Sequence, residues 1–474
     1  CDIEKNTCER LNEESPVSKN RVSFLTLGCR LNQSETDILT RIFKLKGYKV
    51  VHSSEPTDIC IINTCTVTNQ GDSKNRQAIR SMNRLNPKAV IVVIGCYAQL
   101  AYEEISKLKG VRLIIGNERK MEVFDYLEML DTKKQPIIVN DKIGKNSFST
   151  PIVPKNLIKE VINKKSLKQN NSKKYIPILT KSSRTRALLK IQDGCNFMCS
   201  FCVIPFARGR SRYREYSNLL KEAHFLVKEG AREIVITGVN IGTYKNDNFN
   251  FVNVVDSLNS IKGLDRIRIS SIEPTTVPKI LFEYMRDSQH KLVPYFHLPL
   301  QSGSDNILKK MNRRYSSSEF SEEIWRACEA VPDICLGTDV MVGFPEEDEA
   351  EFGKTLNLLK ILPLTYFHVF PFSNRKKTAA YKIKDKIKSD IKKKRSKILH
   401  DLSTKKRKDF YKRFLGKTKD VLFESCGEDL INKGYTDNFI KVLLEEEKNS
   451  NFRNKILPVK ISKIEDNFVL GQTI

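Results

Sequence analysis

The chain has 474 residues and a formal net charge of +26, with 82 Lys and Arg against 56 Asp and Glu. At roughly 100–200 residues per domain, this length predicts two to four domains, and a 40% share of hydrophobic residues excludes a wholly disordered chain. The charge predicts a polyanionic partner, most often a nucleic acid. No apolar run approaches the ~18 residues of a membrane span, so we expect no integral membrane protein.

A first domain is expected over residues 21–150. Three apolar runs in it each end in a cysteine, and each is followed by a segment with helical periodicity. Such repetition predicts a parallel α/β sheet, in which the carboxyl ends of the strands share one edge. We therefore expect Cys29, Cys65 and Cys96 to converge at that edge, although they lie far apart in the sequence.

A central domain is expected over residues 187–413, after a basic stretch at 151–186 that is either a charged linker or a partly helical, solvated segment. Residues 187–372 alternate six strand-like runs with helical segments. Six units are too few for a closed eight-stranded barrel and predict an open, partial (β/α)6 barrel. Residues 375–413 hold 18 basic and 4 acidic residues and predict one long helix suited to phosphate contacts.

The last 61 residues form a third unit of a different kind. Residues 414–474 show short runs of alternating polarity, separated by Gly and Asn turns. This pattern predicts a small all-β module, folded as a β-barrel.

Cys195, Cys199 and Cys202 carry the strongest local signal, because three thiolates in a C-x3-C-x2-C loop can wrap one iron–sulfur cluster. Three ligands leave one iron of a four-iron cluster open. A zinc site is the alternative, but structural zinc sites have a fourth ligand, and the next histidine is the distant His224. Twelve cysteines in a chain of this length are no disulfide scaffold and indicate a reducing, cytoplasmic compartment.

The C-x3-C-x2-C loop at the end of a barrel's first strand resembles that of the radical S-adenosylmethionine (SAM) enzymes. Residues 434–436 (GYT) resemble part of the small RNA-binding β-barrel, the TRAM module, that ends the methylthiotransferases of this superfamily. The other motifs that resemble the methylthiotransferases are TLGCRLNQSE (26–35), NTCTVT (63–68), IGCY (94–97), ARGR (207–210), ITGVNIG (236–242), SSIEP (270–274), HLPLQSGS (297–304) and MNRR (311–314).

The resemblance implies two 4Fe-4S clusters, one on Cys195, Cys199 and Cys202 and a second on Cys29, Cys65 and Cys96. In that family the open iron of the first cluster binds SAM, and its reductive cleavage gives a radical. The second cluster carries a sulfur that another SAM methylates. The CH3–S unit then replaces a hydrogen on C2 of an adenine.

Residues near strand ends at the barrel mouth are candidate SAM contacts. They are Asn240, Glu273, Gln301 and Arg313. Each of the first three could instead cap a helix or satisfy a turn, and Arg313 could instead contact RNA.

The motifs most resemble the branch that acts on N6-threonylcarbamoyladenosine at position 37 of tRNA. That substrate carries a carboxylate, so Arg208 and Arg210 are candidate partners for it, with a surface phosphate contact as the alternative. The basic helix and the terminal module would hold the anticodon stem-loop. An electron donor such as flavodoxin or ferredoxin and a monomeric state are also expected.

Three alternatives remain open at this point. They are methylthiolation of isopentenyladenosine in tRNA, methylthiolation of a ribosomal protein, and a non-catalytic iron–sulfur protein that binds RNA. One departure from the family is visible, because Lys377 stands where the family has Gly. This leaves the local turn in doubt.

Overall fold

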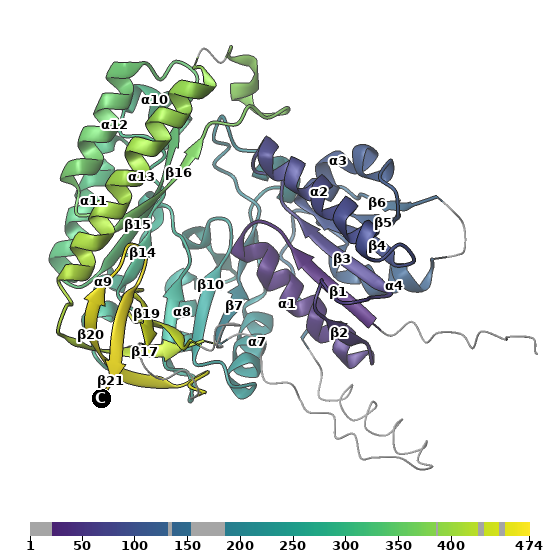
Figure 1. Ribbon diagram of the computed structural model, residues 1–474, viewed down its shortest axis with the longest axis horizontal. Coiled ribbons are helices and arrows are strands. Elements are labelled where there is room, and N and C mark those ends of the chain that lie inside the picture. The colour runs from purple at the N-terminus through teal and green to yellow at the C-terminus, as the bar shows by residue number, and fades with distance from the viewer. Residues whose placement is uncertain (1–20, 131–134, 153–184, 385–386, 425–430, 445–450) are drawn as a thin grey trace, which may run out of the picture.

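The computed structural model describes residues 21–130, 135–152, 185–384, 387–424, 431–444 and 451–474. Most of the basic stretch predicted at 151–186 lies outside these residues. Figure 1 shows an α/β layer, in purple and blue, beside a larger teal and green α/β unit, with a small yellow barrel at one end. Among the helices that the model describes, none is both long and apolar enough to cross a bilayer.

The N-terminal unit is a six-stranded sheet in which every neighbouring pair is parallel. In spatial order the strands are β2 (Lys49–Val51), β1 (Arg21–Thr26), β3 (Ile59–Thr64), β4 (Val90–Gly95), β5 (Val111–Ile115) and β6 (Ile137–Val139). The helices are α1 (Arg30–Leu45), α2 (Asn69–Leu85), α3 (Cys96–Ser106), η1 (Lys120–Glu122) and α4 (Val123–Glu128). The central strands are continuous apolar runs because both faces of the sheet are covered.

The central unit is the predicted open (β/α)6 barrel. It consists of two parallel three-stranded sheets, β13-β10-β7 and β14-β15-β16, which meet at a single bridge between Ile267 and Leu292. The six strands are β7 (Arg186–Lys190), β10 (Glu233–Thr237), β13 (Arg266–Ile269), β14 (Tyr295–His297), β15 (Cys335–Val342) and β16 (Tyr366–Pro371). One large apolar core fills the space between the strands and the helices.

The helices of this unit are α6 (Ile204–Arg208), α7 (Tyr216–Lys228), α8 (Phe251–Asn259), α9 (Ile280–Arg286), α10 (Asp305–Lys310), α11 (Ser317–Ala330), α12 (Glu349–Ile361) and α13 (Ser389–Lys412). Short elements complete it: β8 (Gln192–Asp193), β9 (Arg212–Tyr213), β11 (Lys245–Asn246), β12 (Phe249–Asn250), η2 (Ile241–Thr243), η3 (Pro274–Thr276) and η4 (Ala379–Lys382).

The basic helix α13 is shorter than the predicted span of 375–413. It begins at Ser389, because the residues before it are held against other parts of the molecule. Arg375 forms an ion pair with Asp72 of α2 at 2.7 Å, and the Ala380 N–H donates to the carbonyl of Ser200 at 2.8 Å. This segment therefore connects the end of the barrel to the N-terminal unit.

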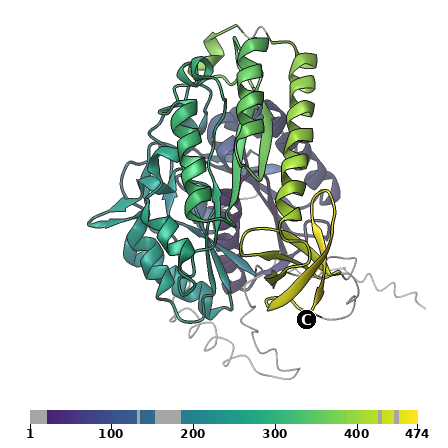
Figure 2. The same ribbon diagram turned by 90° about the vertical axis from the view of Figure 1, so that its left-hand side faces the viewer.

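The C-terminal unit is a closed five-stranded barrel, which confirms the predicted β-barrel. Its strands are β17 (Thr418–Phe423), β18 (Lys433–Thr436), β19 (Lys441–Leu444), β20 (Ile456–Ile464) and β21 (Val469–Thr473). In Figure 2 its yellow strands lie below the green helices. Arg266 and Arg268 of β13 donate to its backbone carbonyls at Tyr435 and Asp437 (2.9 and 2.8 Å), which docks it against the central barrel.

Lys377 adopts a left-handed conformation, with φ 76°. The turn that a glycine would favour is thus present, and a side chain with a Cβ occupies it at an energetic cost. We expect Lys377→Gly to stabilise the chain by about 1 kcal/mol, measured as an increase in the free energy of unfolding in urea. Lys376→Gly serves as the control, and an equal or larger gain in that variant would contradict the backbone explanation.

Candidate functional site

Cys29, Cys65 and Cys96 follow the carboxyl ends of β1, β3 and β4, which are adjacent strands. Burial, and then the negative charges of Cys96 and Cys29, raise the pKa of the Cys65 thiol to about 12. Cys29 and Cys65 line one cavity, and Cys96 follows the strand next to that of Cys65. Thiolates crowded in this way are stabilised by a metal cation. The donor set therefore fits a soft, multinuclear iron centre. We call these residues the N-terminal trio.

Gly28 lets the first and second members of this trio approach each other. Its φ is 97°, and a Cβ placed on it would lie 2.3 Å from the Cβ of Cys65. Asn32 then ties the two loops together, because its side-chain amide donates to the carbonyls of Leu27 (2.9 Å) and Thr64 (3.0 Å). The amide of Asn117 donates to the sulfur of Cys96 at 3.6 Å.

Cys195, Cys199 and Cys202, which we call the barrel trio, lie in the loop between β8 and α6. Gly194 starts this loop with φ 69°, and a Cβ there would lie 2.1 Å from the carbonyl oxygen of Arg210. Burial, with the charges of the other two cysteines, raises the pKa of the Cys202 thiol to about 12. These three thiols also fit an iron–sulfur centre.

Five of the six trio cysteines line one cavity, and the sixth, Cys96, is buried against residues that follow the barrel trio. The cavity has a volume of about 1520 Å³, and it is lined by all three barrel cysteines together with Cys29 and Cys65. Cys96 is buried against Val203 and Ala207, which follow Cys202 in the chain. The two groups of ligands therefore face a common space.

A buried cluster of five charges joins the units that carry the trios. Glu35 of α1 accepts from Lys120 (2.6 Å), Lys190 (2.8 Å) and Arg208 (2.9 Å). Asp193, two residues before Cys195, accepts from Lys190 (2.6 Å) and Arg208 (3.1 Å). Burial acts to raise the pKa of Glu35, but the three cations outweigh it and hold that pKa well below its usual value. The carboxylates therefore stay charged and paired.

Arg208 has a different position from the one predicted. Its side chain is 1% exposed, and its two terminal nitrogens already bond to Glu35, Asp193 and the Asn32 side chain. It is not a free cation at the cavity entrance, because two carboxylates compensate its charge. Arg210, by contrast, is exposed on the turn before β9, and its contact with RNA stays a prediction.

Three of the four predicted SAM contacts line the cavity, and they are Glu273, Gln301 and Arg313. Arg313 pairs with Glu273 at 2.6 Å and reaches the sulfur of Cys199 at 3.3 Å. Gln301 has a left-handed φ of 71°. Asn240 is 2% exposed, beneath the lining residue Val239, and its Oδ1 has no hydrogen-bond partner among the described residues.

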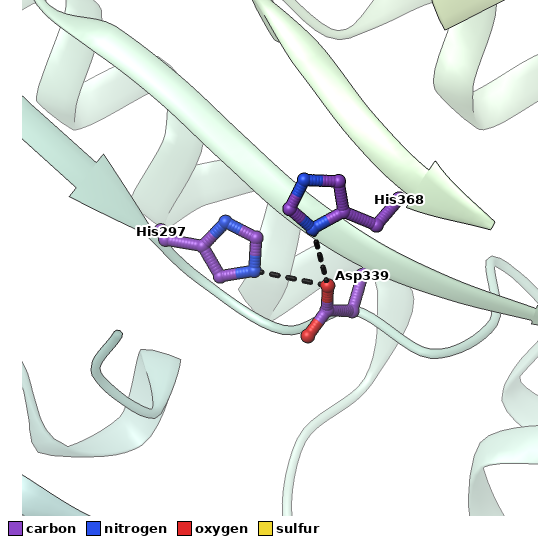
Figure 3. A group of neighbouring side chains, drawn as sticks. All are labelled: His297, Asp339 and His368. Atoms are coloured by element: carbon purple, nitrogen blue, oxygen red, sulfur yellow. Dashed lines mark hydrogen bonds and ion pairs between the residues drawn. The ribbon is translucent and has the colours of Figure 1, made fainter. Parts of the chain in front are cut away.

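The sequence did not predict a cluster formed by His297, Asp339 and His368, on β14, β15 and β16. Figure 3 shows the two rings pointing at one carboxylate oxygen, at 3.1 Å from His297 and 3.3 Å from His368. Burial acts to raise the pKa of Asp339, but these hydrogen bonds hold it below its usual value. All three residues line the cavity, and one ligand atom from each lies within 4.8 Å of the others, close enough to share a metal ion.

Sequence signals for these additional residues exist but are weak. Asp339 is a charged residue in the otherwise apolar strand β15, and Glu35 is an acid on the buried face of α1. Burial of an acid requires a cation or a hydrogen-bond donor nearby. The sequence does not identify that partner, because it comes from a distant segment.

Comparison with known proteins gives matches over most of the chain. The model described as "Uncharacterized protein family UPF0004" matches residues 21–116, and the Radical SAM superfamily model matches residues 189–359. The chain is 38% identical over 428 residues to "Threonylcarbamoyladenosine tRNA methylthiotransferase MtaB" of Aquifex aeolicus, which covers 90% of this chain and 97% of that protein. It is 30% identical over 472 residues to "tRNA-2-methylthio-N(6)-dimethylallyladenosine synthase" of Thermodesulfovibrio yellowstonii, covering 96% and 99%.

Among solved structures, the chain is similar to the radical SAM methyltransferase TsrM from Kitasatospora setae, with cobalamin and a [4Fe-4S] cluster bound. The TM-score is 0.50 at 14% identity, over 74% of this chain and 75% of that one. This similarity shows a shared fold.

Glu35→Gln should strongly destabilise the chain. The neutral side chain leaves the buried cations around it undercompensated, and losing one partner of a buried ion pair costs about 3–5 kcal/mol. Urea unfolding measures the loss. Arg119→Gln is the matched control, because it breaks the exposed ion pair with Glu122 and should leave the midpoint unchanged. Equal effects from the two variants would refute the importance of the buried cluster.

Proposed function

The chain belongs to the radical SAM tRNA methylthiotransferases, and we propose that it transfers a methylthio group to C2 of N6-threonylcarbamoyladenosine at position 37 of tRNA. One observation carries the proposal: two separate trios of cysteines border the same cavity. The Aquifex relative, named as a threonylcarbamoyladenosine tRNA methylthiotransferase, supports this substrate, because the chain is 38% identical to it and 30% identical to the relative named for dimethylallyladenosine.

We assign one 4Fe-4S cluster to each trio. When bound, the clusters and SAM supply the radical and the methylthio group, which an aromatic C–H cannot otherwise acquire. The protein's part is to hold both sets of ligands around one substrate-sized space. The buried cluster of Glu35, Asp193 and Arg208 does so by fixing α1 to the start of the barrel trio.

Arg313, Glu273 and Gln301 are proposed to hold SAM beside the barrel trio. A cation and an anion next to Cys199 match the carboxylate and ammonium groups of the amino-acid end of SAM. The unpaired, buried Oδ1 of Asn240 is available as an acceptor behind the cavity wall. Burial raises the pKa of Glu273, and the positive charge of Arg313 opposes part of that rise.

The RNA is proposed to bind where basic residues of α13 and of the C-terminal barrel meet the cavity. Lys392 and Arg407 of the helix and Lys441 of β19 line its rim. Cations in this arrangement suit the phosphates of a stem-loop. We further propose a monomeric, cytoplasmic enzyme that receives electrons from a flavodoxin or ferredoxin.

Deleting the gene should remove 2-methylthio-N6-threonylcarbamoyladenosine from tRNA and leave the precursor nucleoside in its place. Mass spectrometry of tRNA nucleosides measures both. Returning the wild-type gene should restore the product, whereas Cys195→Ala should not. An unchanged level of the product in the deletion strain would refute the proposal, and loss of the dimethylallyl product instead would identify the other substrate.

A further inference from the structure

Arg30 is a half-buried cation of the cavity wall that has no acidic partner among the described residues. The cavity-lining residues Arg208 and Arg313 are paired with carboxylates, and Arg407 donates to the side-chain oxygen of Asn467. Arg30 also lines the cavity and is only partly exposed. No carboxylate in the described part of the chain forms an ion pair with it. A guanidinium placed this way is available to an anion.

Arg30 lines the cavity together with two members of the N-terminal trio and with several aromatic residues. It is the first residue of α1 and directly follows Cys29. Burial raises the pKa of Tyr295 and of Tyr366, and the positive charge of Arg30 opposes both rises. Its charge also acts on Tyr435 of the C-terminal barrel. All three tyrosines line the same cavity as Arg30.

The aromatic side chains near Arg30 suit a nucleobase. Tyr435 and Phe439 are stacked, with ring centres 4.9 Å apart and an angle of 18° between the planes. Tyr295 lies against Phe439 at 4.8 Å. Unstacked RNA bases are commonly held on such rings. Aromatic rings in one cavity with a cation that no carboxylate compensates match a base that carries an anionic substituent.

We propose that Arg30 binds the carboxylate of the substituent on N6 of the substrate adenosine and thereby selects it over adenosines with neutral substituents. A guanidinium fork binds a carboxylate through two parallel hydrogen bonds. C2 and C6, the carbon that carries N6, belong to the same six-membered ring, so a base with C2 near the trios carries its N6 substituent in the same cavity, where Arg30 follows Cys29. The inference rests on the proposed function, and it gives to Arg30 the role expected of Arg208.

Arg30 would both favour the substituent that carries a carboxylate and disfavour a neutral one. A carboxylate gains a charge-assisted pair in a partly desolvated site, where the attraction is stronger than in water. A neutral dimethylallyl group would instead leave the guanidinium without a partner and partly dehydrated. A site built for a polar group discriminates strongly against an analogue that lacks it.

The test compares two anticodon stem-loops that differ only at position 37, one with N6-threonylcarbamoyladenosine and one with unmodified adenosine. Binding to the reconstituted enzyme is measured by fluorescence anisotropy, and methylthiolation by mass spectrometry. Arg30→Gln should weaken binding of the threonylcarbamoyl stem-loop about 10- to 100-fold and leave the other unchanged. Arg30→Lys keeps the positive charge but cannot form two parallel hydrogen bonds, so it should lose less affinity for this stem-loop than Arg30→Gln does.

Lys441→Gln is the matched control, because Lys441 lines the same cavity from β19. It should weaken both stem-loops equally, as a phosphate contact would. Equal weakening of both stem-loops by Arg30→Gln would assign Arg30 to the phosphates and overturn the inference. The inference would also be overturned if Lys441→Gln, but not Arg30→Gln, lost the preference for the threonylcarbamoyl stem-loop over the unmodified one. A wild-type enzyme that leaves the threonylcarbamoyl stem-loop unmodified would refute the proposed function itself.

Discussion

The guanidinium of Arg208, shared between Glu35 and Asp193, is the contact on which the rest of the site depends. Glu35 belongs to the helix that starts after Cys29, and Asp193 precedes Cys195 by two residues. The bonds between them therefore fix the distance between two groups of ligands that belong to different domains. Burying five charged side chains carries a large desolvation penalty. Ion pairs offset it, because each of the two acids contacts at least two cations.

Charge pairing separates the cations that hold the structure together from the cation that we propose to bind substrate. Arg208, Arg266 and Arg268 are buried and bonded to carboxylates or backbone carbonyls, so they hold domains together. Arg30 is partly exposed and faces the cavity. The closed β-barrel adds Tyr435 and Phe439 to the same wall, so residues of all three units line the cavity.

Much of this architecture could be predicted from the sequence because its signals are local. Strand–helix repetition indicated the parallel sheet and the partial barrel, and both are present. Three strands of the N-terminal sheet were missed: β2 and β6, because a run of three residues has no readable alternation, and β5, a five-residue apolar run that does not end in a cysteine. The start of α13 was also missed, since Arg375 is held by Asp72, about 300 residues earlier in the chain.

The partners of buried charges could not be predicted, because they come from several distant segments. The sequence placed Arg208 in a motif but gave no indication that Glu35 would compensate its charge. His297, Asp339 and His368 come together only when β14, β15 and β16 pair. By contrast, the positions of the six trio cysteines followed from their spacing and from the rule that parallel strands end at one edge.

Iron and acid-labile sulfide, counted per chain in anaerobically reconstituted protein, test the central claim most directly. Two four-iron clusters predict about eight irons in the wild type and about four in either Cys29→Ala or Cys195→Ala. Cys60→Ala, which changes a buried cysteine of β3 outside both trios, should keep about eight. A wild type with only about four irons, or a Cys29→Ala variant with the full wild-type content, would contradict the account.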